Sequence, residues 1–180
     1  RDGDRLGFPV FPLQWRDPKT GEISSGYRES GYFPDAFINM IALLGWNPGD
    51  TREVFTLEQL VQEFSLERVG KSGAVFDVEK LKCMNEQHMR LLTDEQMLEL
   101  VKPILQEKHW GAFSDDYIKQ IFGLMRERVK FPQDYVESCS YFYKDPHTFD
   151  EAAKAKSWTE QTSVLLQGLL DRYKKLETFD

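Results

Sequence analysis

One stretch of this sequence concentrates cationic side chains at a spacing that could recognise a nucleotide. In Leu124-Met-Arg-Glu-Arg-Val-Lys130, Arg126 and Lys130 are four residues apart and would share one face of a helix. A guanidinium group offers a rigid fork of donors that can pair with two acceptors on the edge of a base. An arginine near the end of a helix can instead stabilise the free carbonyl groups there. Arg128 is open to both interpretations, and its spacing alone favours the second.

A glycine-flanked loop, Gly70-Lys-Ser-Gly73, is a second candidate for binding. It lacks the G-x-x-x-x-G-K-[ST] spacing of a nucleotide-binding phosphate loop. Its backbone N–H groups, together with Lys71 and Ser72, could still contact one phosphate of a nucleic acid. An ordinary surface turn explains the same residues more simply, so both interpretations are kept.

The sequence offers no pattern for an independent catalytic or metal centre. Asp115-Asp116 is a pair of carboxylates, but it directly follows Ser114, which is expected to cap a helix, and acidic residues in a first turn favour the helix dipole. Cys83 and Cys139 do not make a disulfide framework, and a reducing cytosolic setting is the simpler interpretation. The three histidines lack the spacing of a zinc site. We therefore predict no catalytic residue and no metal in this chain.

The elements that must position these side chains are mainly helices. Two short extended segments around the turn Arg16-Asp-Pro-Lys-Thr-Gly21 predict a hairpin within the first thirty residues. Pro34 suits the first turn of a helix, and Gly45 is expected to end that helix in the left-handed conformation. The apolar stripe expected on this helix comprises Phe33, Phe37, Met40, Ile41 and Leu44.

Further helices are indicated by capping signals. Three pairs of residues have the spacing of a capping box, in which each side chain accepts a hydrogen bond from the backbone N–H of the other residue. They are Thr56 with Gln59, Thr93 with Gln96, and Ser157 with Glu160. A helix after Ser114 is expected to carry apolar residues as far as Val129. Pro103 should kink or end the helix that contains it. The other expectations are an inward face of Leu57, Leu60, Val61 and Phe64, and a short strand at Ala74-Val-Phe76.

Length and charge limit the number of domains and the classes of partner that this chain can bind. The 180 residues suffice for one domain or two small ones, and we place a boundary near residue 92, between a small mixed α/β region (1–92) and a helical bundle (93–180). A formal net charge of −7 argues against a protein that coats nucleic acid by bulk electrostatics. A local basic face on an acidic body remains compatible with it. No apolar run is long enough to span a membrane.

Six segments, in order, resemble one enzyme family. They are Gly31 to Trp46, Glu53 to Leu60, Phe64 to Val69, Phe76 to Leu81 with Met84 and Asn85, Val101 to Pro103, and Leu124 to Arg126 with Arg128. In amino-acid sequence and in their order along the chain, these segments are similar to the C-terminal half of bacterial-type glutamyl-tRNA synthetases. The resemblance covers most of residues 31–130, whereas the last fifty residues match only in helical character.

The resemblance implies a tRNA-contacting piece of a ligase. Residues 1–92 would contact the tRNA stem and connect to the catalytic part, and residues 93–180 would form the first, C-terminally incomplete part of a helical anticodon-binding domain. Arg128 matches a position where the family can use arginine to inspect the third anticodon base. Arg1 would be the last residue of the Lys-Met-Ser-Lys-Ser-type loop. The further candidate tRNA contacts are Arg126, Lys71, Ser72 and Arg90.

The resemblance also sets expectations for activity and partners. The parent enzyme would ligate glutamate to tRNA(Glu) with ATP and magnesium, whereas this chain, which begins without Met, would lack the catalytic domain, be inactive alone and hold no cofactor. We expect a cytoplasmic monomer that binds tRNA(Glu) but neither DNA nor membrane. Two departures are Cys83, where many members have Trp, and a longer segment at residues 5–30 than compact members have. The alternative is a helical protein–protein interaction module without RNA binding, and an independent enzyme is less favoured.

Overall fold

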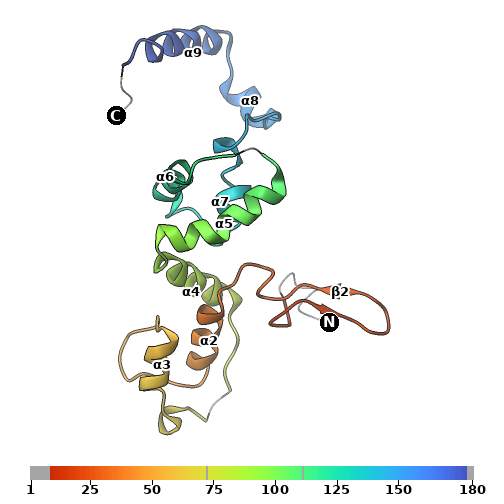
Figure 1. The fold of residues 1–180 in the computed structure, drawn as a ribbon, viewed down its shortest axis with the longest axis vertical. Coiled ribbons are helices and arrows are strands. Elements are labelled where there is room, and N and C mark those ends of the chain that lie inside the picture. The colour runs from red at the N-terminus through yellow and green to blue at the C-terminus, as the bar shows by residue number, and fades with distance from the viewer. Residues whose placement is uncertain (1–8, 72, 111, 178–180) are drawn as a thin grey trace. The chain divides into compact units, whose positions relative to one another are not determined.

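The computed structural model describes residues 9–71, 73–110 and 112–177. The chain divides into two units, residues 1–143 and residues 144–180 (Figure 1). The fold is mostly helical, as predicted, with an antiparallel hairpin near the N-terminus.

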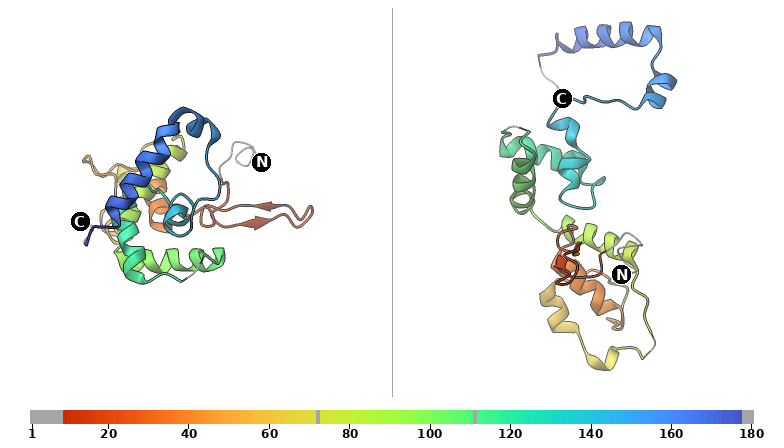
Figure 2. Two further views of the ribbon diagram at one scale, coloured as in Figure 1. Left: turned by 90° about the horizontal axis from the view of Figure 1, so that it is seen from above. Right: turned by 90° about the vertical axis from the view of Figure 1, so that its right-hand side faces the viewer.

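The predicted hairpin is present at the start of the first unit. Strand β1 (Trp15–Arg16) pairs with β2 (Ile23–Ser24), so that Trp15 lies opposite Ser24 and Arg16 opposite Ile23. Gly21 ends the turn with a φ of +72°, a conformation that glycine adopts without strain. Figures 1 and 2 show the hairpin projecting away from the helices of its unit.

The first hydrophobic core, which we call the α2–α4 core, forms where α2 (Pro34–Leu43) packs on α4 (Val78–Arg90). Pro34 occupies the first turn of α2, and Asp77 caps α4 through the N–H groups of Glu79 and Lys80. The buried members of this core are Tyr27, Tyr32, Ala36, Met40, Leu81 and Met84.

One expectation for α2 was right in part and another was wrong. Of the expected apolar stripe, Met40 is buried, and Phe33, Phe37 and Leu44 pack against the α2–α4 core. The buried face of α2 is Ala36, Asn39 and Met40, whereas Ile41 of the expected stripe is 50% exposed. The face therefore lies about one position away from the stripe that apolarity alone suggested. Gly45 does not adopt the left-handed conformation. Its carbonyl group accepts a hydrogen bond from the Gly70 N–H at 2.7 Å, and a Cβ there would meet Val69 Cγ1 at 3.4 Å.

A small cluster of Trp46, Phe55 and Leu60, which we call the Trp46 cluster, holds α3 (Leu57–Glu63) and the 3-10 turn η1 (Leu66–Arg68). The capping box of Thr56 and Gln59 is confirmed. Of the predicted inward face only Leu60 is buried. The strand expected at residues 74–76 does not form, and those residues lead directly into the cap of α4.

A buried polar network joins α2 and α4 to the segment before α3. Asn39 Oδ1 accepts hydrogen bonds from the Phe55 N–H at 2.9 Å and from His88 Nε2 at 3.1 Å. Because this oxygen can only accept, the proton of neutral His88 must lie on Nε2. Burial lowers the pKa of His88 from its ordinary value of 6.5, although the Asp35 carboxylate opposes this shift. The folded state therefore favours the neutral imidazole.

This network predicts a loss of stability in mild acid. Because the pKa of His88 is lower in the folded chain than in the unfolded chain, the unfolded state binds more protons as pH falls through about 6.5, and the free energy of unfolding decreases. We expect the urea midpoint to drop between pH 7.5 and 5.5 more steeply in the unaltered chain than in His88→Gln. His147→Gln, at an exposed histidine, is the matched control. Parallel pH profiles for the unaltered chain and His88→Gln would contradict this prediction.

The second hydrophobic core, the α5–α7 core, is built from α5 (Asp94–Lys108), α6 (Asp115–Met125), α7 (Asp134–Glu137) and the 3-10 turn η2 (Ser140–Phe142). The capping box of Thr93 and Gln96 and the Ser114 cap are confirmed. Pro103 does not end α5, which continues to Lys108. Fully buried members include Val101, Ile118, Ile121, Phe122, Val129, Tyr135, Val136 and Cys139.

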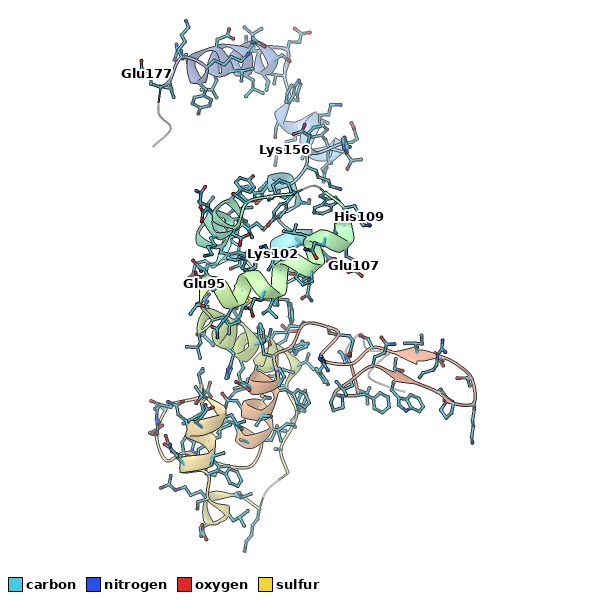
Figure 3. All side chains as sticks on the ribbon, in the orientation of Figure 1. Glu95, Lys102, Glu107, His109, Lys156 and Glu177 are labelled. Atoms are coloured by element: carbon cyan, nitrogen blue, oxygen red, sulfur yellow. The ribbon has the colours of Figure 1, made fainter. Side chains whose placement is uncertain are left out.

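Ion pairs tie the outer faces of α5 and α6 together. Glu95, labelled at the start of α5 in Figure 3, accepts from Lys119 Nζ at 2.7 Å, and Lys102, labelled farther along, binds Asp115 at 2.6 Å. The Asp115-Asp116 pair thus lies in the first turn of α6, as the structural interpretation expected, with one member neutralised by a lysine. Exposed pairs of this kind contribute at most about 1 kcal/mol each.

The second unit contains α8 (Glu151–Ser157) and α9 (Glu160–Tyr173). The cap of α9 is Thr159 with Thr162, not Ser157 with Glu160, because Ser157 is the last residue of α8. No residue of either helix is buried. None of the helices in the described part of the chain is both long and apolar enough to cross a membrane.

Candidate nucleic-acid interface

The residues expected to contact RNA occupy two separate places in the first unit. Arg90, Arg126 and Arg128 belong to the region where α4, α5 and α6 meet, whereas Lys71 follows η1 beside the Trp46 cluster. Figure 1 shows α3 at the opposite end of this unit from α5 and α6. Ser72 and Arg1 lie outside the described residues.

Arg126 is engaged by a carboxylate. Helix α6 ends at Met125, so Arg126 and Lys130 do not share a helix face, contrary to our expectation. The Arg126 guanidinium binds Asp94 Oδ1 at 2.7 Å, and both side chains are nearly half exposed. Burial raises the pKa of Tyr135 to about 12, and Arg126 opposes this rise through its charge and a side-chain hydrogen bond. Arg126 therefore links α6 to α5 and α7.

Arg90 is held by two carboxylates from different elements. Its guanidinium binds Glu86 on α4 and Glu127 Oε2 at 3.0 Å, directly after α6. Glu127 itself is 77% exposed. An ion pair open to water costs little to separate, so a phosphate could replace the carboxylate of either Glu127 or Asp94. Both arginines nevertheless have a structural role in this fold.

Arg128 and Lys130 differ from these arginines because their charged groups have no partner in the described part of the chain. Both side chains are exposed, and neither forms a hydrogen bond or an ion pair with any residue in the described ranges. The backbone N–H of Arg128 donates to the Met125 carbonyl at 2.8 Å. The Arg128 side chain binds none of the described carbonyls at the end of α6, so the helix-capping interpretation finds no hydrogen bond to support it. The guanidinium is free to bind an external acceptor.

The glycine-flanked loop is partly committed to the fold. The Gly70 N–H already donates to the Gly45 carbonyl, which removes one of the donors expected for a phosphate. Lys71 is exposed and has no partner among the described residues. A Cβ at Gly73 would meet nothing within 4 Å. Gly70 is therefore anchored to the fold, and Lys71 beside it is an exposed cation without a partner among the described residues.

The aromatic side chains near these arginines belong to the core. Tyr135 is fully buried, Phe131 packs edge-to-face on Tyr32 at 5.0 Å, and Trp110 and Phe113 both pack on Tyr143. They fill space between elements of the fold.

A polar junction connects this region to the α2–α4 core. Asn85, completely buried on α4, accepts from the Phe33 N–H at 2.8 Å and donates to the Lys130 carbonyl at 3.2 Å and the Gly31 carbonyl at 3.5 Å. Gln133 Nε2 donates to the Ser30 carbonyl at 2.9 Å. Asn85 thus binds the backbone on both sides of the junction.

Sequence reasoning missed the residues that hold the cationic segment. The carboxylate of Asp134 accepts from the N–H groups of Lys130 and Phe131 at 2.9 and 3.0 Å. Asp94 and Glu127, which bind Arg126 and Arg90, were also missed. The one usable signal was Asn85, a polar residue at an apolar position of a helix, between Leu81 and Met89. Among the described residues no group of three or more His, Cys, Asp or Glu side chains could hold a metal.

Two family models match the chain in succession. The model of the catalytic domain of class I tRNA synthetases for Glu and Gln matches residues 13–83, and that of an anticodon binding domain matches residues 96–180. The second match contains the whole segment from Arg126 to Lys130.

Individual relatives extend this result to the whole length of the chain. It is 44% identical over 180 residues to the glutamate–tRNA ligase of Parabacteroides distasonis and 48% identical over 179 residues to that of Phocaeicola vulgatus. The crystal structure of a glutamate tRNA ligase from Elizabethkingia meningosepticum, in complex with its amino acid, matches 98% of the chain with a TM-score of 0.92 at 44% identity. The chain spans about 35% of the length of each of these relatives.

Proposed function

Because the chain is homologous over its whole length to members of the glutamate–tRNA ligase family, we propose that it is the tRNA-contacting part of such a ligase. The full-length ligase would join glutamate to tRNA(Glu) with ATP and magnesium. The described residues of this chain would bind and orient the tRNA. In the cell we place the ligase in the cytoplasm, as a monomer.

One observation supports this function most directly. Arg128 lies inside the match to an anticodon binding domain, and its guanidinium is exposed and without a partner in the described structure. A planar fork of donors that is not used by the fold is suited to a base edge or a phosphate. We assign Arg128 to the third anticodon base, with Arg126 and Arg90 as secondary contacts that would exchange a carboxylate for a phosphate.

The same reasoning divides the chain into two working parts. We propose that residues 1–92 contact the tRNA stem, with Lys71 and Ser72 on a phosphate, and that residues 93–180 contact the anticodon. The two larger cores change over within α4, shortly before this boundary, since Met84 is the last buried residue of the α2–α4 core and Met89 is the first of the α5–α7 core. The match of residues 13–83 to a catalytic-domain model supports a place for the first part beside the catalytic site.

Salt dependence of tRNA binding tests this function. We expect the chain to bind tRNA(Glu) with an affinity that falls linearly on a logarithmic plot against salt, because each cation that neutralises a phosphate releases counterions. Fluorescence anisotropy with labelled tRNA(Glu), titrated between about 50 and 200 mM salt, measures the slope. A polyaspartate of similar length is the competitor for bulk charge. Equal affinity for tRNA(Glu) and for this polymer at all salt concentrations would contradict specific recognition and favour a protein–protein interaction module.

A further inference from the structure

We propose that Lys130 is a second RNA contact beside Arg128, and that Asp134 is the positioning residue that fixes the backbone carrying both side chains. This inference rests on the proposed function and extends it to Lys130 and Asp134, which are not among the candidate tRNA contacts that the sequence suggested. It concerns the segment Arg126–Lys130, in which every residue contacts the rest of the fold, whereas the charged groups of Arg128 and Lys130 have no partner within residues 9–71, 73–110 and 112–177.

The first half of the segment is held by its side chains. Arg126 is bound to Asp94, and Glu127 is bound to Arg90. The Arg126 N–H continues the helical hydrogen-bonding pattern by donating to the Phe122 carbonyl at 2.9 Å. This end of the segment is therefore tied to α4, α5 and α6 at once.

The second half is held through its backbone. Val129 is 1% exposed and inserts into the α5–α7 core. Asp134 Oδ2 accepts from two successive N–H groups, those of Lys130 and Phe131. The Lys130 carbonyl accepts from Asn85. Both polar groups of the Lys130 backbone are thus satisfied by the protein, while its ammonium group is left without a partner among the described residues.

A backbone that is held by the fold, with two charged groups left over, fits a polyanionic ligand. A guanidinium group reads acceptors in fixed geometry, whereas an ammonium group acts as a compact point charge suited to a phosphate. Two cations separated by one buried residue on a fixed backbone could contact neighbouring groups of a single strand. Preorganisation matters here because a contact made from a mobile loop loses part of its free energy to ordering.

Substitution of Asp134 separates positioning from simple electrostatics. Asp134→Ala and Asp134→Asn remove the same negative charge, so electrostatics alone predicts that both variants bind RNA slightly more tightly. Only Asn retains an oxygen that can accept from the Lys130 and Phe131 N–H groups. We expect Asp134→Ala to lose most of the roughly 5- to 150-fold discrimination at the third anticodon base, and Asp134→Asn to keep it. Equal discrimination by the two variants would overturn the positioning role.

The salt slope tests Lys130 itself. We expect Lys130→Ala to make the slope of log affinity against log salt shallower by about 0.7, the value for one phosphate contact on a single strand. Lys108→Ala removes the same charge at the opposite end of α5 from Asp94, the partner of Arg126, so its slope should stay unchanged. The same slope change in both variants, or none in Lys130→Ala, would overturn this contact.

The outcomes also distinguish this inference from the proposed function. Arg128→Gln, measured in the same series, reports on the function itself. If Arg128→Gln alters base preference while the Lys130 and Asp134 variants do not, only the further inference fails. If no variant alters binding and tRNA is not preferred over polyaspartate, the proposed function fails. Circular dichroism melting of each variant keeps loss of fold apart from loss of contact, and Lys130→Ala, at an exposed side chain, is expected to fold normally.

Discussion

Arg128→Gln is expected to reduce discrimination at the third anticodon base by roughly 5- to 150-fold, the equivalent of about 1–3 kcal/mol for a bidentate contact. The thermal midpoint should change little, because the Arg128 side chain is exposed and binds no described residue. Surface substitutions without such contacts usually stay within about 0.5 kcal/mol. Affinity for tRNA transcripts that differ only at the third anticodon base measures the effect.

Arg16→Gln is the matched control for this experiment. Arg16 is also an exposed arginine without a described partner, but it lies on β1 of the hairpin. Its replacement removes the same charge, and base preference should be retained. A large drop in the thermal midpoint of Arg128→Gln with unchanged base preference would instead assign Arg128 to stabilising the end of α6.

Asn85→Ala should destabilise the fold more than any of the surface substitutions. The Asn85 side chain is completely buried and makes hydrogen bonds to Phe33, Gly31 and Lys130. Each buried polar group left without a partner costs about 1–3 kcal/mol, and the cavity adds to that cost. We expect the free energy of unfolding to fall by about 3 kcal/mol or more, measured by urea denaturation.

Asn47→Ala provides the comparison at an exposed position. Among the residues that the structure describes, Asn47 Oδ1 accepts only from the nearby Gly49 N–H, at 2.7 Å. Its replacement should cost about 1 kcal/mol or less, because water can satisfy the released group. Equal losses for the two asparagines would mean that the junction between the two larger cores contributes nothing beyond a local turn.

The features that could be predicted from the sequence are those decided within a few residues. The Thr56 and Thr93 capping boxes and the Ser114 cap bind groups three residues away, so their patterns are visible in the sequence. The hairpin was predicted for the same reason, because its turn residues lie together in the chain.

Features that depend on distant neighbours were predicted poorly. Ile41 and Val61 have the apolarity of core residues, but no element covers them, and they are 50% and 77% exposed. The α6 helix was expected to extend to Val129, yet it ends at Met125, and Val129 reaches the core from the segment that follows. Burial depends on which elements meet, and a pattern along one segment does not contain that information.

Contacts between distant residues also decide which side chains of the candidate site are available. The type and spacing of Arg126 and Arg128 allowed an RNA contact but favoured helix capping for Arg128, and Arg90 became a candidate only through the family resemblance. The partner of Arg126 lies 32 residues away, and that of Arg90 lies 37 residues away at Glu127. Sequence alone therefore could not tell the engaged arginines from Arg128. That distinction needs the fold.

The polar junction has a consequence for the order in which the chain is made and folded. Ser30 and Gln133, which it joins, are separated by 103 residues. At a synthesis rate of about 5–20 residues per second, the ribosome needs on the order of 5–20 s to make Gln133 after Ser30. During that interval the Ser30 carbonyl lacks its Gln133 partner, while the hairpin and α2, whose contacts are closer in sequence, can already form. The link between the two larger cores is therefore among the last parts of the first unit to close during translation.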